Sequence, residues 1–449
     1  MSSLNKNIFY TFLTQFPNLF FGILSGIFIT RILGSEGKGV LTIFQTNIDF
    51  LVLVLGISVN SGLVYFIASK KISYNRLLGI SCYLILLGTF IISIITVMIM
   101  AGFEMNFLFP DDYNSTFFLF YLSTTFLINL TKIIIIGILQ GFKNFQIINW
   151  LTIALGGLNT VIFGLLFYIF HIQLFDIDIK MMFESFLLIN FISLIAYIFL
   201  YAKHHYCTPS FKLNYHLEVK PFFKYIGIGH ISQLINFLNY RFDIWIITYY
   251  CSMELLGLYS LAVNIAQFMW MISNPIATVL MPYLSDPKND NDKKITMLKI
   301  YSKINTSLVL ILSIMIFLLS DFLVPLLYGI EFTSAVLPLK ILLIGIFFSS
   351  IYKPFSTYIA GKNQLKYNLI ATSGGLFFTI VLGLSLIPKW NIIGASIATN
   401  ISYIVTATFV FYAAMYKLKL PISNYFILTL SDIRQLYKKI TIYEKRKRD

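Results

Sequence analysis

Long apolar stretches separated by short polar segments recur along the whole 449-residue chain. Each stretch has about 20 residues or more, which is enough for a helix to cross roughly 30 Å of hydrocarbon. The first begins around Ile8 with no small-residue cleavage site after it, so we expect a retained span and not a signal peptide. The pattern predicts an all-α integral membrane protein with twelve spans, near residues 9–31, 39–66, 77–101, 116–139, 147–170, 182–203, 222–248, 254–283, 298–320, 338–360, 366–388 and 392–416.

The apolar pattern repeats at half length. The second copy lies 218 positions after the first, as Gln233 does after Gln15, and the same residue types recur in both: Gln15, Asn18, Thr30, Glu36 and Gly39, then Gln233, Asn236, Thr248, Glu254 and Gly257. Six spans in each copy give both the same orientation, about an axis along the membrane normal. We therefore predict a six-helix half at 1–203, a cytoplasmic linker at 204–221 and a second six-helix half at 222–416. The basic tail at 417–449 either forms an interfacial helix or is solvated.

Polar residues inside the spans recur at three- and four-residue steps, so each set lies on one helix face. The sets in spans 1, 2, 7 and 8 are Thr14, Gln15, Asn18, Gly22 and Ser25; Thr42, Gln45, Thr46, Asp49, Gly56 and Asn60; Ser232, Gln233, Asn236, Asn239, Tyr240 and Asp243; and Ser260, Asn264, Gln267 and Asn274. Because polar side chains are costly in lipid, the simplest geometry is a central hydrophilic cavity lined by these four spans. The alternative is hydrogen bonding between packed helices.

Charged residues inside the spans are few. Asp49 and Asp243 are the acids placed well inside, and each could bind a proton or cation or pair with a base. Arg241 either lines the cavity edge or extends to the outer interface. Lys132 and Lys353 fall in spans 4 and 10, which are equivalent helices of the two halves. Two symmetry-related ammonium groups could receive a phosphate, or they could reach the inner interface instead.

Composition and charge support the same class. The chain is 58% apolar and 12% charged, against about 25% charged in soluble domains, and its mean hydropathy is +0.80. The net charge of +14 is concentrated in alternate loops, which places both termini in the cytoplasm and argues against nucleic acid as a partner. Three scattered cysteines form no CxxC pair, so we expect no metal site, no disulfide framework and no cofactor.

Two Asp-x-Asp tripeptides, Asp176–Asp178 and Asp290–Asp292, raise the alternative of a membrane-embedded glycan polymerase or glycosyltransferase. Both fall in short polar loops without a βα domain to hold a nucleotide. We therefore expect a transporter and not an enzyme.

The segment Thr30–Val40, which reads TRILGSEGKGV, resembles the N-terminal signature of bacterial polysaccharide-transport flippases, with Ser35 in place of the usual proline. The stretch Asp243–Leu261 is similar to their second-half counterpart. These Wzx-type O-antigen flippases belong to the multidrug/oligosaccharidyl-lipid/polysaccharide (MOP) exporter superfamily. The resemblance implies a V-shaped bundle that flips undecaprenyl-diphosphate-linked oligosaccharide to the outer leaflet of a bacterial inner membrane. It also implies polysaccharide polymerase and chain-length proteins as partners.

Our hypothesis is alternating access, in which the polar residues of the spans take the following roles. We expect the sugars to contact Gln15, Asn18, Asn236, Asn264 and Gln267. The diphosphate would meet Lys132 and Lys353, with Arg241 at the cavity edge, and Asp49 or Asp243 would couple transport to a proton or sodium gradient. The multidrug branch typically has an acid in the first span, where this chain offers Gln15 and Asn18. That difference disfavours a multidrug/cation antiporter, which remains the alternative.

Overall fold

The computed structural model describes residues 2–103, 115–174, 177–205, 207–286, 290–417, 419–420 and 425–426, with side chains from residue 16 onward except those at 228 and 417. Every regular element in these ranges is helical. The main helices are α1 (Ser2–Gly56), α2 (Val59–Ser69), α3 (Tyr74–Met100), α4 (Thr116–Gly141), α5 (Phe145–His171), α6 (Ile179–His205), α7 (Lys220–Tyr250), α8 (Met253–Ala266), α9 (Trp270–Ser285), α10 (Asn291–Tyr328), α11 (Val336–Gly361) and α12 (Leu365–Tyr412). Short π and 3₁₀ turns join them: η2 (Tyr215–Val219), η3 (Gln267–Met269), η4 (Ile330–Ala335) and η5 (Ala413–Lys417).

Nine segments of the described chain are long and apolar enough to cross a membrane. Two of them contain a non-helical residue, Gly34 in α1 and Asn391 in α12, which splits each long helix in two. If α1 and α12 each count as two spans, and α7 is added, the nine segments become the twelve predicted spans. The prediction of a multi-pass all-α membrane protein is confirmed, whereas the number twelve stays a prediction.

A sharp break separates α1 from α2. Ile57 and Ser58 both have positive φ, 44° and 52°. This is a left-handed backbone conformation, which residues other than glycine adopt only at a cost in free energy. The break lies inside the range predicted as the second span. The polar face of that span is therefore carried by two helix segments that differ in direction.

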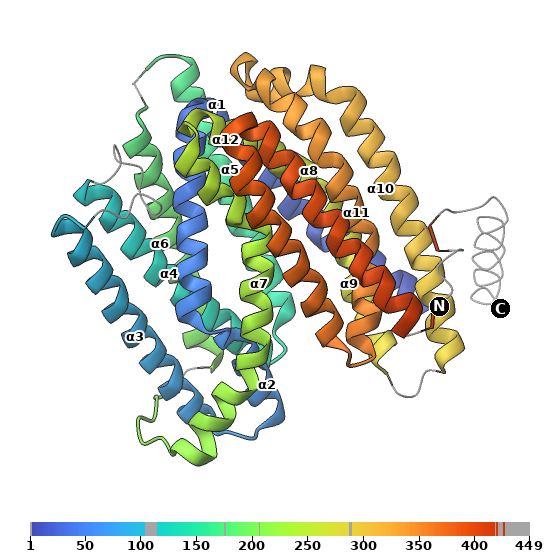
Figure 1. The fold of residues 1–449 in the computed structure, drawn as a ribbon. Helices are drawn as coiled ribbons and strands as arrows, with labels where there is room; N and C mark the ends of the chain where they lie inside the picture. The colour runs from blue at the N-terminus through green and yellow to red at the C-terminus, as the bar shows by residue number, and fades with distance from the viewer. Residues whose placement is uncertain are drawn as a thin grey trace, which may run out of the picture. The chain divides into compact units, whose positions relative to one another are not determined.

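The chain packs as two compact units. The N-terminal unit is Pro17–Leu258, and the C-terminal unit is Tyr259–Asp449 together with Met1–Phe16. In the N-terminal unit α4 packs against α2, α3, α5 and α6, and in the C-terminal unit α11 packs against α9, α10 and α12 (Figure 1). The predicted halves, 1–203 and 222–416, stay a prediction. Most of the predicted tail lies outside the described residues.

The two copies of the sequence repeat touch inside the N-terminal unit. A Cβ atom on Gly39 would fall against the carbonyl oxygen of Met253, and one on Gly257 would fall against that of Ser35. Met253 and Gly257 follow Ser35 and Gly39 by the same 218 positions. The contact is therefore reciprocal, and the absence of side chains at both glycines lets the backbones of α1 and α8 approach.

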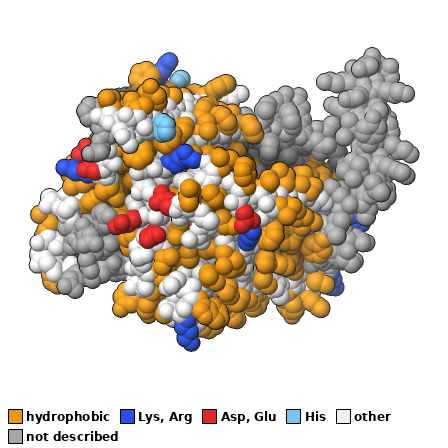
Figure 2. Space-filling view, turned by 90° about the horizontal axis from the view of Figure 1, so that it is seen from above, with side chains coloured by type: hydrophobic (Ala, Val, Ile, Leu, Met, Phe, Trp, Pro, Cys, Tyr) orange, Lys and Arg blue, Asp and Glu red, His pale blue; other side chains and the backbone are white. Residues whose placement is uncertain are grey.

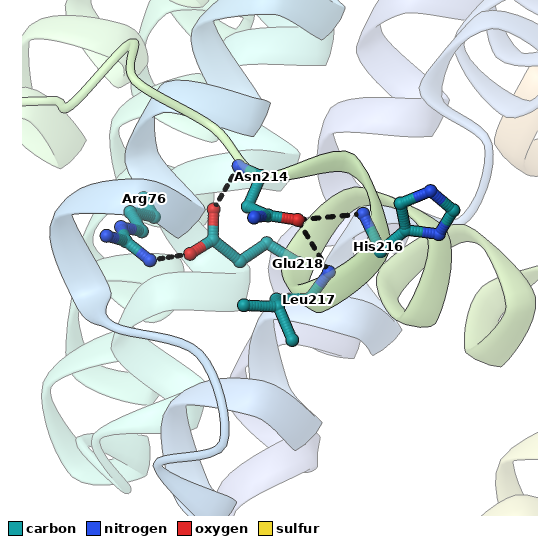
Figure 3. Close-up of polar contacts among 5 residues, drawn as sticks. All are labelled: Arg76, Asn214, His216, Leu217 and Glu218. Atoms are coloured by element: carbon teal, nitrogen blue, oxygen red, sulfur yellow. Dashed lines mark hydrogen bonds and ion pairs between the residues drawn. The ribbon is translucent and has the colours of Figure 1, made fainter.

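Part of the predicted linker (204–221) packs against the start of α3 and is called the strap below. Residue Glu218, in η2, pairs with Arg76 and accepts a hydrogen bond from the backbone N–H of Asn214 at 2.8 Å (Figure 3). The Asn214 side chain in turn caps η2 by accepting from the backbone N–H groups of His216 and Leu217, at 3.0 and 3.1 Å. The Glu218 side chain is only 4% exposed, so its charge is neutralised where water is scarce.

Three further bonds hold the same strap. The backbone N–H of Ser210 donates to the carbonyl oxygen of Asn75 at 2.8 Å. The Cys207 thiol donates to the Asn75 side-chain oxygen at 2.9 Å, and the Tyr74 hydroxyl donates to the carbonyl oxygen of His205 at 2.9 Å. The predicted linker is therefore a packed element and not a free loop.

In the described part of the face shown in Figure 2, hydrophobic side chains outnumber charged ones. On α3 the exposed apolar residues recur at three- and four-residue steps: Tyr83, Leu86, Leu87, Phe90, Ile94, Val97 and Met100. Such a stripe is suited to contact with hydrocarbon.

Candidate functional site

The second part of α1 exposes two polar side chains. Gln45 and Asp49 are exposed, whereas the intervening Thr46 and Ile48 and the preceding Phe44 are buried. Residues four apart lie above one another on a helix. A glutamine and an aspartate on one exposed face of an apolar helix are unsuited to lipid, so this face calls for water or a polar ligand.

Arg241 of α7 lies toward this face. Its guanidinium charge acts on Asp49 and on Lys38, both of α1. Lys38 is buried and Arg241 is half-buried. All three residues belong to the N-terminal unit, with one acid and one base on α1 and one base on α7.

The predicted stripe on α7 runs from exposed to buried. Gln233 is exposed and Asn236 half-buried, while Asn239 and Asp243 are 3% and 5% exposed. Asp243 accepts a hydrogen bond from the N–H of Ile244 at 2.9 Å. Asn239 and Asp243 are therefore closed to a ligand in this conformation, whereas Gln233 has an exposed side chain.

The α1–α2 break meets the open end of that stripe. The Ser58 hydroxyl donates to the Gln233 side-chain oxygen at 3.0 Å and lies 3.2 Å from Nδ1 of His230. The break and α7 are thus joined by side chains, each of which could instead bind a polar ligand.

Lys132 of α4 is half-buried and donates to the side-chain oxygen of Asn190, on α6, at 3.0 Å. The Asn190 amide is itself oriented by donating to the carbonyl oxygen of Phe186 at 3.0 Å. The ammonium is therefore held inside the N-terminal unit by an amide and not by an acid.

In the C-terminal unit, α8 and α9 also expose a polar face. Asn264, Asn274 and Thr278 are exposed between buried neighbours, and Gln267 is half-buried. Ser260, the first residue of the predicted stripe, is buried at 3% exposed. The stripe therefore opens from Asn264 onward.

Lys353 of α11 belongs to a network of polar and aromatic side chains. Its ammonium donates to the side-chain oxygen of Asn274 at 2.7 Å and lies 4.2 Å from the ring centroid of Trp270. The Trp270 indole N–H donates to the Ser349 hydroxyl at 2.7 Å, which fixes the ring. A cation over an indole face is stabilised by the ring quadrupole, so Lys353 is positioned without an acidic partner.

The predicted residues fall in both units. Asn18, Asp49, Lys132, Asn236, Arg241 and Asp243 lie in the N-terminal unit; Asn264, Gln267 and Lys353 lie in the C-terminal unit. The side chain of Gln15 lies outside the described residues. The Asn18 side-chain oxygen is buried, and within the described chain it has no hydrogen-bond partner. A common cavity for these residues stays a prediction.

Sequence reasoning missed His230, Trp270 and Asn190. Trp270 follows Gln267 by three residues and so continues the polar stripe, but an indole counts as apolar in a hydropathy pattern. Asp290 belongs to one of the two Asp-x-Asp tripeptides that were considered and set aside as a nucleotide-sugar motif. Its carboxylate accepts a hydrogen bond from the N–H of Asn291 at 2.7 Å, at the start of α10. Asp176 of the other tripeptide lies outside the described residues.

The model of the family described as "Polysaccharide biosynthesis protein" matches residues 4–288, more than half of the chain. The chain belongs to this family. A relative in Haloferax volcanii, named as a probable low-salt glycan biosynthesis flippase, is 24% identical over 199 residues. That match covers 44% of this chain and 41% of the relative, so the chain spans less than half of the relative's length.

Solved structures share the fold of this polysaccharide biosynthesis protein. An inward-facing multidrug-resistance transporter of the MATE family, in the MOP superfamily, gives a TM-score of 0.68 at 15% identity, covering 90% of this chain and 96% of that one. The lipid II flippase MurJ gives 0.61 at 17% identity, covering 96% and 92%. The prediction of a polysaccharide-transport family is confirmed by the family match, whereas at these identities the solved structures establish the fold alone.

Proposed function

We propose that this protein carries a lipid-linked oligosaccharide across a membrane by alternating access. The observation that carries the proposal is that polar side chains are exposed on membrane-spanning helices, each directly next to a buried residue. They are Gln45 and Asp49 on α1 and Asn264 and Asn274 on α8 and α9. Membership of a polysaccharide biosynthesis family gives the substrate class, and a glycan biosynthesis flippase among the relatives supports it.

In this proposal twelve spans form two six-helix halves arranged as a V, in a bacterial inner membrane with both termini cytoplasmic. The sugars of an undecaprenyl-diphosphate carrier contact amide side chains, while the polyprenyl tail stays in lipid. These amides are Gln15, Asn18, Asn236, Asn264 and Gln267. Amides both donate and accept hydrogen bonds, which suits sugar hydroxyl groups.

The diphosphate is assigned to Lys132 and Lys353, with Arg241 at the cavity edge. Each lysine is held by an amide oxygen, Asn190 or Asn274, so its charge is not neutralised by that partner. An ammonium has three donors, and a phosphate can accept from those the amide leaves. Asp49 and Asp243 are assigned to a coupling proton or sodium ion.

The deciding experiment uses purified protein in vesicles that contain lipid-linked oligosaccharide extracted from the source cells. We expect the glycan to become accessible to an added lectin only when protein is present. Efflux of ethidium is measured in the same vesicles. Ethidium efflux without glycan translocation would overturn the proposal in favour of a multidrug antiporter.

Lys353→Met tests the anion role. Methionine keeps an apolar stem beside Trp270 but removes the charge, so we expect folded protein with translocation slowed about tenfold or more, as for loss of a charge-assisted hydrogen bond of about 1.5–3 kcal/mol. Lys340→Met is the matched control, because Lys340 lies on the same helix and pairs with Asp321 instead. Equal rates in both variants would remove Lys353 from the mechanism.

A further inference from the structure

A cavity of about 680 Å³ lies against α2 in the N-terminal unit. Its lining comes from three helices, and the residues are Asn60, Ser61, Val64, Tyr65, Ala68 and Ser69 of α2, Gln140 of α4 and Tyr225 of α7. Ser61, Ala68 and Ser69 are exposed and small. They recur along one helix face, so the hollow arises because that face has little side-chain volume.

One wall of the cavity is aromatic. The rings of Tyr65 and Tyr225 stack, with centroids 4.1 Å apart and planes 14° from parallel. Phe66 meets Tyr225 edge-on at 5.7 Å, which holds the stack in place. Tyr225 is nevertheless 46% exposed, so this positioned ring still offers surface to a ligand.

Amides and hydroxyls complete the lining. Asn60, Gln140, Ser61 and Ser69 each supply a polar side chain, and the Asn60 side-chain oxygen is buried without a hydrogen-bond partner in the described chain. A buried acceptor left unpaired costs free energy. In this structure that oxygen lies against Gly137 of α4, so the Asn60 side chain would have to turn to bring it to a hydroxyl donor in the cavity.

The lining excludes several ligand classes. Among the described residues that line the cavity none is charged, so it is unsuited to hold a phosphate or a metal ion. The lining also holds Val64, Ala68 and two tyrosine rings, so a lipid tail is the competing occupant that the test must distinguish from a sugar. A ring with apolar C–H faces and hydroxyl edges matches an aromatic wall beside amides, and that is the chemistry of a neutral sugar.

The side chain of Lys71 supplies a positive charge at the edge of the cavity, next to Tyr65. The ammonium of Lys71 donates to the Tyr65 hydroxyl at 2.6 Å. Lys71 follows α2 in a loop whose basic residues predict the cytoplasmic side. A sugar in the cavity would therefore have its linking phosphates next to a positive charge that is exposed to solvent.

We propose that this cavity is a glycan subsite that binds a neutral sugar unit of the lipid-linked oligosaccharide on the cytoplasmic side. The proposal rests on the proposed function for the identity of the glycan. The sugar stacks on Tyr225 and hydrogen-bonds with Asn60 and Gln140. The subsite would select the glycan before it enters the membrane-spanning part of the path.

The test is protection of a cysteine from N-ethylmaleimide in purified protein. Ala68→Cys places the thiol in the cavity, and Ala202→Cys places a control thiol on the exposed end of α6, both in a chain with serine at positions 82, 207 and 251. Three probes are compared: lipid-linked oligosaccharide from the source cells, the same glycan released by mild acid, and undecaprenyl phosphate without glycan.

We expect the first two probes to slow modification of Ala68→Cys at least threefold and to leave Ala202→Cys unchanged. Adding Tyr225→Ala should raise the glycan concentration needed for half-protection by about fivefold to tenfold, in the range of aromatic contacts, while Tyr225→Phe should retain protection. Protection by undecaprenyl phosphate alone would overturn the proposal, because it would make the cavity a lipid site.

Failure of this inference is distinguishable from failure of the proposed function. Glycan translocation in vesicles without protection of Ala68→Cys by either glycan probe would overturn the subsite and leave the flippase. Protection by the released glycan with no translocation would support the subsite and count against the flippase.

Discussion

Gly39 and Gly257 show how a single missing side chain decides whether two helices can touch. A Cβ at either position would meet a backbone carbonyl oxygen, that of Met253 or of Ser35. Backbone cannot move aside as a flexible side chain can. The two glycines are therefore required by packing and not by φ, since both lie in ordinary helix.

Gly39→Ala and Gly257→Ala should each destabilise the protein by about 1–3 kcal/mol or more, because overpacking against backbone forces the helices apart. The measurement is the unfolding temperature in detergent. Gly22→Ala, in the part of α1 before Gly34, is the control, because a Cβ there would have nothing within 4 Å. It should be neutral or slightly stabilising, since alanine favours helix over glycine. Equal stability of all three variants would contradict this packing.

The sequence predicted which glycines correspond in the two copies, but not that they touch. A repeat gives equivalent positions, whereas contact depends on how the copies pack. The stripe on α1 shows the same limit, because Gln45 and Asp49 are exposed while Thr42 and Thr46 are buried. Thr42 donates to the Lys38 carbonyl oxygen at 2.8 Å, so its hydroxyl is satisfied within its own helix. Periodicity identifies a face but not which neighbours cover it.

At the scale of the element, the predicted linker makes contacts that the sequence did not reveal. Its position between the predicted halves suggested a simple connection. The structure instead ties it to α3 by the Arg76–Glu218 pair and by bonds to Asn75. Hydropathy cannot reveal such a strap, because its bonds join polar groups far apart in the chain. The helices themselves were predictable, since each apolar stretch exceeds the thickness of hydrocarbon.

Glu218→Ala should release the strap, because it removes both the ion pair with Arg76 and the bond from Asn214. Hydrogen bonds to charged groups contribute about 1.5–3 kcal/mol. We expect trypsin to cleave after the exposed Lys212 about tenfold faster or more, as local opening becomes easier. Asp321→Asn disrupts the more exposed pair with Lys340 and is the control. Unchanged cleavage after Lys212 would show that the pair does not hold the linker.

At the scale of the whole molecule, the prediction concerns the side of the membrane on which each loop lies. The alternation of basic loops places the start of α10 in the cytoplasm and η4 outside. The 38 residues of α10 span about 57 Å at 1.5 Å per residue, enough to reach both sides. A single helix thus separates two loops of opposite predicted location.

In cells with an intact membrane, an impermeant maleimide should label Ser334→Cys, in η4, and not Lys293→Cys, at the start of α10. Both positions are exposed, so accessibility is set by the membrane alone. Both variants carry serine at positions 82, 207 and 251. Permeabilised cells should label both cysteines equally. Labelling of both from outside would reverse or break the predicted topology.

The break at Ile57 and Ser58 is a point of backbone strain. Each of these two residues stores roughly 1–3 kcal/mol while its backbone is left-handed, and that free energy returns if the segment straightens. Local conformation at this point therefore favours a straight segment, and packing around the break must offset that preference. An ion gradient that drives a conformational change at this break would add to or oppose this local preference for a straight segment.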